Sequence, residues 1–395
     1  MNILNYSVFL FCCFGQWSVS LRVYGFSISS LYVVGLILTC FVLMSRVRSL
    51  VLPNGRIFLY FTVFVIYAAA WALVIYLDES YSDSSVLVWF ACYSLMINIY
   101  SQPGMATEAV LELKKSFTAF LYFYILVLGV TILLKDEDPA TTQVGIAFVA
   151  FCISSYFHES KSKWIFLSVT IFVGQVLLKA RGVVLAELLM ILILSLVFNL
   201  SRRGVYTGFL YFLVQLLLLI SASVIIFSYS GLGEKSIEGG DQALEFAGYS
   251  LNTSGRIYQW GVMIDSISES LFVGHGIPVA KQMMNVPGWF HPHNDYLRLL
   301  HQLGLIGLSA WLLFIIKSGW LIVRIFRASV DPVISVISLA ALGTVCGQSL
   351  IMFTDNTMVY PYVIFLLFLQ LGVLLRYHKE WGGRGKGSFM GAYKN

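Results

Sequence analysis

Charged side chains are scarce in this chain of 395 residues. Asp, Glu, Lys and Arg together make up 11% of it, whereas hydrophobic residues make up 58%. A soluble globular protein carries about 25% charged residues, so this chain has too few charges to cover a surface that faces water. The composition therefore excludes a soluble enzyme and predicts a protein that is solvated by lipid.

Cysteine frameworks and basic clusters are also lacking. The six cysteines lie inside apolar runs without a CxxC spacing, which argues against disulfides and against a cysteine-bound metal. The formal net charge is only +5 and the basic residues are scattered, which argues against nucleic acid as a partner. The first five residues lack the basic side chains of a signal peptide, so we expect the first helix to be retained.

What the chain does contain is a series of apolar runs, each bounded by charged or turn residues. These runs predict an all-α polytopic membrane protein with about twelve transmembrane helices. The predicted helices cover residues 4–21, 25–45, 57–77, 85–103, 116–134, 143–158, 163–178, 182–200, 206–229, 302–323, 332–353 and 357–375.

The distribution of Lys and Arg predicts how these helices are oriented. With a cytoplasmic N-terminus, 16 of the 25 basic residues lie on inner segments, whereas the outer hairpins 78–83 and 135–138 are rich in acid. Cytoplasmic loops of membrane proteins carry an excess of Lys and Arg. We therefore expect both termini in the cytoplasm and an even number of helices.

One connection, residues 230–301, is much longer than the others, and the orientation places it outside. Long loops are usually functional. Within it, residues 254–270 predict a short helix, because apolar residues recur there at spacings of three and four. The chain thus divides into an N-terminal transmembrane bundle of about nine helices (1–229), a periplasmic loop (230–301), C-terminal transmembrane helices (302–376) and a cytoplasmic tail (377–395).

Short motifs follow one another in this loop and beside it. They are Lys179-Ala180-Arg181-Gly182, Ser254-Gly255-Arg256 with Trp260, Gly274-His275-Gly276, His293-Asn294-Asp295-Tyr296-Leu297 and Leu303-Gly304-Leu305-Ile306-Gly307. In this order they resemble the signature region of the O-antigen ligase and O-antigen polymerase superfamily. Ala180 stands where that family usually has a hydroxyl residue.

The resemblance implies an all-helical membrane glycosyltransferase, without a cofactor, at the periplasmic face of the inner (cytoplasmic) membrane of a bacterium. Its donor would be a glycan on undecaprenyl diphosphate. The acceptor would be a second lipid-linked glycan for a polysaccharide polymerase, or the lipid A core of lipopolysaccharide for a ligase. Membrane lipids and a chain-length regulator protein are further expected partners.

Such a transfer needs a base for the acceptor hydroxyl and cations for the diphosphate. The leaving diphosphate is a weak base, so no strong general acid is demanded. His293 is the candidate catalytic base, since a histidine exchanges protons near neutral pH; its alternative is an interfacial histidine without a role. His291 and His293 form an HxH pair, but no further ligands follow at a recognisable spacing, so we expect no metal.

Arg256 and Arg181 are the candidates for binding the diphosphate. A guanidinium group offers a planar fork that matches phosphate oxygens, and it stays charged. The alternative for Arg181 is a cation at a helix end that reaches toward the lipid surface. The alternative for Arg256 is an ordinary solvated side chain.

Six further residues are candidates for supporting roles: Asn294, Asp295, Arg298, Asp355, Trp260 and Tyr296. We expect the side chains of Asn294, Asp295 and Asp355 to orient the base or the acceptor. Arg298 would add a cation. The rings of Trp260 and Tyr296 would stack on sugars. Their ordinary alternatives are a helix cap, a lipid headgroup contact and interfacial anchors.

Three functions remain open at this point. An inverting, metal-independent polymerase is favoured, because residues 293–307 resemble exopolysaccharide polymerases at least as well as ligases, and because the chain shows no second outer domain for a protein acceptor. An O-antigen ligase is the first alternative. A flippase or exporter of lipid-linked oligosaccharides is the alternative from another class, but transporters usually show two similar halves, and none are visible in this sequence.

Overall fold

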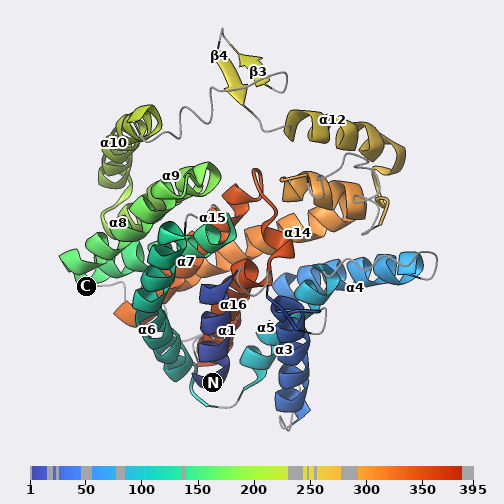
Figure 1. Ribbon diagram of the computed structural model, residues 1–395. Helices are drawn as coiled ribbons and strands as arrows, with labels where there is room; N and C mark the ends of the chain where they lie inside the picture. Colours follow the sequence, from blue (N-terminus) through green and yellow to red (C-terminus); the bar gives the residue numbers. More distant parts are fainter. Residues whose placement is uncertain are drawn as a thin grey trace.

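The computed structural model describes residues 2–15, 21–23, 26–45, 56–76, 85–102, 104–134, 139–229, 243–246, 249–252, 256–276 and 292–384. This part of the chain is almost entirely helical (Figure 1), which confirms the predicted all-helical class. Its strands form two short antiparallel pairs, β1 (Arg22–Val23) with β2 (Phe26–Ser27) and β3 (Ala243–Phe246) with β4 (Tyr249–Asn252).

Each of the twelve predicted membrane helices overlaps a helix of the structure, and the predicted loop helix is α12. The helices are α1 (Asn2–Phe14), α3 (Ile28–Ser45), α4 (Arg56–Tyr76), α5 (Ser85–Ser101), α6 (Ala106–Leu133), α7 (Pro139–Glu159), α8 (Ser162–Leu177), α9 (Arg181–Arg202), α10 (Val205–Tyr229), α12 (Arg256–Ile267), α14 (Asp295–Ala328), α15 (Pro332–Ile351) and α16 (Pro361–Arg384). Two 3₁₀ turns, η1 (Ser268–Ser270) and η2 (Thr357–Val359), follow α12 and precede α16.

Length and composition mark this as a multi-pass membrane protein. Among the described residues, six helices are long and apolar enough to cross a membrane, namely α3, α6, α9, α14, α15 and α16. Shorter apolar stretches lie in α1, α4, α5, α8 and α10. Large apolar side chains such as Leu126 and Phe166 are 63% and 71% exposed, as expected for side chains that face lipid. The full count of twelve spans stays a prediction.

The centre of the bundle is formed by α15 and α16, whose membrane-length windows are 83% and 94% buried. Aromatic rings fill the space between α16 and its neighbours. Phe61 of α4 lies with its ring centroid 4.6 Å from Phe314 of α14 and 4.7 Å from Phe368 of α16. In contrast, only 17% of the window in α3 is buried, so α3 lies at the rim. The segment that precedes α16 therefore lies near the middle of the bundle.

Two helices begin more than four residues before the start that their apolar runs predicted. The predicted start at residue 302 was wrong, because α14 begins at Asp295, and the predicted start at 116 was wrong, because α6 begins at Ala106. Both missed stretches carry charged side chains, which a search for apolar runs treats as boundaries. In α14 these early polar residues are buried by the rest of the protein.

The long helix α14 is interrupted at Gly304, whose backbone angles are φ 61° and ψ −167°. Residues 271–276, which follow η1, lie across this kink and exchange backbone hydrogen bonds with both of its sides. These bonds join Leu305 N–H to Leu271 O, Ile306 N–H to Phe272 O, His275 N–H to His301 O and Gly276 N–H to Gln302 O, at 2.8–3.2 Å. A side chain on Gly304 would overlap the backbone of Phe272. The two glycine-containing motifs thus meet, and they fix α12 to α14.

Candidate functional site

Five segments meet at one end of the bundle. They are the first turns of α7, the turn between α8 and α9, the start of α12, the residues before α14 and the turn between α15 and α16. The predicted base His293 and the predicted cations Arg181 and Arg256 all lie on these segments, as does Asp355. The structure therefore brings together residues that are up to 174 positions apart in the sequence.

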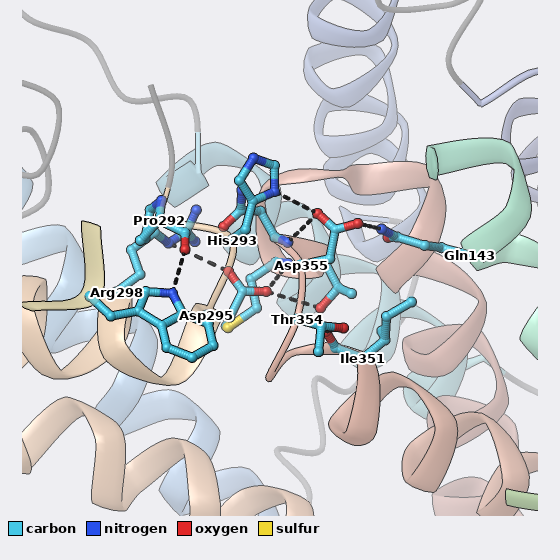
Figure 2. A network of polar contacts seen from close by, with 12 residues as sticks. Gln143, Pro292, His293, Asp295, Arg298, Ile351, Thr354 and Asp355 are labelled. Carbon is cyan, nitrogen blue, oxygen red and sulfur yellow. Dashed lines mark hydrogen bonds and ion pairs between the residues drawn. The ribbon is translucent and has the colours of Figure 1, made fainter. Parts of the chain in front are cut away.

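His293 and Asp355 form a histidine–carboxylate pair (Figure 2). The Nδ1 atom of His293 lies 3.2 Å from Oδ1 of Asp355. The side chain of His293 is 41% exposed and that of Asp355 is 12% exposed. When Nδ1–H donates to the carboxylate, the other ring nitrogen, Nε2, carries the lone pair that accepts a proton. His293 thus has the anchored and partly open ring that a general base requires.

The backbone at His293 is left-handed, with a φ of 49°. Residues other than glycine seldom adopt this conformation, and such strain is found at functional sites. Directly after it, Asn294 caps α14, because its Oδ1 accepts a hydrogen bond from Leu297 N–H at 3.1 Å. The chain therefore turns at His293 into the helix while the ring faces Asp355.

Asp355 has partners on both of its carboxylate oxygens. Oδ1 also accepts a hydrogen bond from the backbone N–H of Asn356 at 2.8 Å. Oδ2 accepts one from the side-chain amide of Gln143 in α7, with Nε2 at 2.7 Å (Figure 2). Since a carboxylate with several donors is held in one orientation, Asp355 presents a fixed acceptor to His293.

Asp295 ties the start of α14 to the segment that carries Asp355. Its backbone N–H donates to the carbonyl of Met352 at 2.8 Å. Its buried carboxylate accepts hydrogen bonds from the hydroxyl of Thr357 at 3.0 Å and from Met358 N–H at 2.9 Å. These contacts lie on both sides of Asp355, so Asp295 fixes where this segment runs.

Arg298, the arginine predicted for a supporting role, lies on α14 and faces the protein interior. It is 1% exposed, and its Nε lies 3.6 Å from Oδ1 of Asp295. Its guanidinium nitrogens have no hydrogen-bond partner among the described residues. An ion pair in such a place offsets the cost of burying each charge, and it balances the buried carboxylate of Asp295.

Arg181 is the first residue of α9, directly after a tight turn. Lys179, with a φ of 53°, ends α8 in a left-handed conformation. Lys179 N–H donates to Val176 O and Ala180 N–H donates to Gln175 O, which is the Schellman arrangement that closes a helix. Ala180 then precedes α9 without a side-chain cap, where a hydroxyl residue would supply one.

Gly182 brings this turn against the segment of Asp355. A Cβ atom built on Gly182 would lie 2.6 Å from Oγ1 of Thr354, which is closer than real Cβ atoms approach. Glycine therefore allows α9 to begin next to Thr354. As a result, Arg181 and Asp355 are the direct sequence neighbours of Gly182 and Thr354, which lie in close contact.

Arg256, the first residue of α12, belongs to the same cluster. Burial lowers the pKa of its guanidinium, the nearby Asp355 carboxylate raises it, and the nearby charge of Arg181 lowers it further. Its Nε is buried without a hydrogen-bond partner among the described residues. Arg256 thus lies within electrostatic reach of both the carboxylate of Asp355 and the guanidinium of Arg181, so two guanidinium groups belong to one cluster.

The two predicted aromatic residues hold backbone segments in place. Trp260 of α12 donates its indole N–H to the carbonyl of Pro292 at 2.8 Å, next to the predicted base. The hydroxyl of Tyr296 donates to Ser349 O in α15 at 2.8 Å, and its ring lies 4.4 Å from that of Phe353. Both residues therefore shape the surroundings of His293 in the structure.

Gln143 and Gly182 were not singled out in the sequence, although both shape the site. Gln143 lies at the start of the apolar run of α7 and contacts Asp355 across 212 positions, so no local pattern marks it. Gly182 is part of a motif, but its role depends on Thr354, far along the chain. Residue 291, the other half of the HxH pair, lies outside the described residues.

The structure thus defines a multi-pass membrane protein in which a partly open histidine, held by a carboxylate, lies beside two arginines at one end of the helical bundle. The family model described as O-antigen ligase matches residues 166–312. The match spans Arg181, Arg256 and His293 and confirms the resemblance to the O-antigen ligase and polymerase superfamily. It supports a membrane enzyme of the ligase or polymerase type. A search of curated proteins finds no match.

Proposed function

We propose that this chain is an inverting, metal-independent glycosyltransferase that acts on undecaprenyl-diphosphate-linked glycans at the periplasmic face of the bacterial inner membrane. Its favoured activity is that of a surface polysaccharide polymerase, which joins lipid-linked repeat units. The observation that carries the proposal is the contact of 3.2 Å between His293 and Asp355, with Arg256 and Arg181 in the same cluster.

In this mechanism the acceptor hydroxyl oxygen attacks the anomeric carbon of the donor glycan. A carbon–oxygen bond forms as the bond between that carbon and the diphosphate oxygen breaks, and attack from the opposite side inverts the anomeric configuration. Nε2 of His293 takes the hydroxyl proton, and Asp355 stabilises the resulting imidazolium. The diphosphate leaves with the bonding electrons, and Arg256 and Arg181 bind its charge.

The orientation belongs to the proposal as well. We propose twelve membrane spans with both termini in the cytoplasm. In support, the ends of α9 and α14 that lie away from the site are basic and meet each other: Arg202 Nη2 donates to Ser329 O at 3.3 Å, and Arg327 Nε donates to Ser201 Oγ at 3.4 Å. Since basic residues favour the cytoplasmic side, the opposite ends, which carry Arg181 and His293, face the periplasm.

An O-antigen ligase is the second candidate, and the description of the matching family favours it. A ligase would use the same donor, base and arginines, and its acceptor would be the lipid A core instead of a second lipid-linked glycan. The residues of the site act on the donor and on the acceptor proton, which both activities share. The choice between them therefore depends on the acceptor that is supplied.

The proposal is tested with the purified protein in proteoliposomes and a radiolabelled lipid-linked repeat unit. The wild type should form glycosidic bonds, while His293→Ala, Arg256→Ala and Arg181→Ala should each lower the rate by about 10²-fold or more. Arg324→Ala is the matched control, because Arg324 is exposed near the other end of α14. Near-normal transfer by His293→Ala would remove the base from the mechanism.

The same assay separates the candidate activities. A ladder of longer lipid-linked glycans supports the polymerase. Transfer that occurs only when lipid A core is added supports the ligase. Movement of the labelled lipid across the bilayer without bond formation would instead support a flippase.

A further inference from the structure

The side chain of Gln143 completes the histidine–carboxylate pair from a helix that carries no other predicted site residue. It belongs to α7, and it is fully buried. Its Nε2 donates to Oδ2 of Asp355 at 2.7 Å, while His293 contacts Oδ1 of the same carboxylate. The three side chains therefore form a line in which the amide and the imidazole hold opposite oxygens (Figure 2).

The carboxylate of Asp355 needs such a partner because its last torsion is soft. The terminal torsion of an aspartate is broad and roughly two-fold, so the side chain does not fix its own orientation. A buried carboxylate oxygen without a donor also costs free energy. An amide group supplies the donor without carrying a charge and without taking a proton, so it orients Asp355 and engages only part of the carboxylate's negative charge.

The start of α7 is itself held on two sides, which keeps the amide in place. The hydroxyl of Tyr124 in α6 donates to the carbonyl of Thr141 at 2.9 Å. The amide of Gln175 in α8 donates to the carbonyl of Thr142 at 3.0 Å. Both carbonyls directly precede Gln143, so neighbouring helices fix the backbone from which this side chain extends.

The residue two positions further along also favours this packing. A Cβ atom on Gly145 would lie 2.6 Å from the hydroxyl oxygen of Tyr124 and would overlap the amide of Gln175. Glycine at this position therefore allows α6 and α8 to approach α7 where they bind its backbone. Contacts from α6 and α8 therefore hold the part of α7 from which the amide of Gln143 extends.

We propose that Gln143 is a positioning residue for glycan transfer, which fixes the carboxylate of Asp355 and thereby the ring of His293. This inference rests on the proposed function, and it adds a residue of α7, outside the span matched by the family model, to the machinery of the site. Gln143 touches neither donor nor acceptor in this account, so its effect passes entirely through Asp355.

The experiment compares Gln143→Leu in two backgrounds, the wild type and Asp355→Asn, in the full-length reconstituted protein. Leucine keeps the approximate size and removes the donor. In the wild-type background we expect kcat to fall by at least tenfold, with KM for the lipid-linked donor changed less than twofold. In the Asp355→Asn background, measured in long incubations with radiolabelled donor, we expect less than a twofold further loss, because the coupled partner is already gone.

Gln370→Leu is the matched control. Gln370 is a fully buried glutamine of α16 whose amide atoms have no hydrogen-bond partner in the described part of the chain. We expect its replacement to leave kcat within twofold of the wild type. Equal losses from Gln143→Leu in both backgrounds, or no loss in either, would overturn the inference.

The dependence of kcat on pH distinguishes a positioning role of Gln143 from a merely structural one. Without the amide donor, more of the negative charge of Asp355 is left to stabilise protonated His293. The acid limb of the kcat profile should therefore shift to higher pH in Gln143→Leu, whereas general loosening of the bundle would lower the rate at all pH values without shifting the limb. An unshifted limb contradicts the inference.

Different results would overturn the proposed function and the role of Gln143. If the wild type and His293→Ala transfer glycan equally well, the proposed function is wrong and the inference is wrong with it. If His293→Ala is inactive but Gln143→Leu retains the kcat and pH profile of the wild type, the proposed function stands and only the role of Gln143 is overturned.

Discussion

The imidazole of His293 lies 3.2 Å from the carboxylate of Asp355, although 62 residues separate them in the chain. The contact joins the residues before α14 to the turn between α15 and α16. It is exposed on the side of the histidine and mostly buried on the side of the aspartate. This arrangement gives the ring one anchored nitrogen and one that can accept a proton.

Asp355→Asn should lower kcat by about 10²–10⁴-fold and leave KM for the lipid-linked donor nearly unchanged. An asparagine can hold the ring, but it carries no charge to stabilise the imidazolium, and its amide can favour the wrong tautomer. Steady-state rates in proteoliposomes measure the effect. A variant with wild-type kcat would show that the carboxylate only caps the turn.

Arg256→Lys should weaken binding of the diphosphate even though the charge is kept. Lysine lacks the planar fork that pairs with two phosphate oxygens, so the inhibition constant of the product undecaprenyl diphosphate should rise by about tenfold, or about 1.4 kcal/mol. Arg324→Lys serves as the control. An unchanged inhibition constant in Arg256→Lys would place the diphosphate elsewhere.

Gly182→Ala should reduce activity through a steric effect that a second substitution relieves. The added methyl group would lie 2.6 Å from Oγ1 of Thr354 but 3.5 Å from its Cβ. Shortening residue 354 removes the first contact and leaves the second at an ordinary distance. We therefore expect Gly182→Ala with Thr354→Ala to recover most of the transfer rate, and failure to recover would mean that the glycine has another role.

Gly304→Ala should destabilise the protein, whereas Gly319→Ala in the same helix should not. Gly304 has a φ of 61° and lies against the backbone of Phe272, while a Cβ on Gly319 would meet nothing within 4 Å. Strain of this kind costs about 1–3 kcal/mol, and alanine in a regular helix is favourable. Thermal unfolding in detergent compares the two variants, and equal midpoints would contradict the kink at Gly304.

The helical class could be predicted because each membrane helix needs a long apolar run, which is a local property of the sequence. The starts of α14 and α6 could not, because their first turns contain charged residues such as Asp295 and Glu108. Hydrogen bonds from Thr357 and Met358 compensate the burial of the Asp295 carboxylate. These partners are distant in sequence, so composition alone makes the turn look like a loop.

The candidate site, too, could be predicted from the sequence only in part. His293, Arg181 and Arg256 lie in short motifs, so the sequence could point to them. The pairing of His293 with one particular carboxylate could not be chosen among its neighbours, and the amide of Gln143 was missed because nothing near it in α7 distinguishes it. Contacts between helices decide both, and they depend on how α7, α14 and α15 pack.

The most direct test of the central claim measures both products of one reaction. Wild-type protein in proteoliposomes, given lipid-linked repeat units, should release one undecaprenyl diphosphate for each glycosidic bond formed, and the new bond should have the inverted anomeric configuration. His293→Ala should do both at least about 10²-fold more slowly while reaching the membrane at wild-type levels. Equal release and bond formation by His293→Ala, or a retained configuration in the wild-type product, would contradict the account.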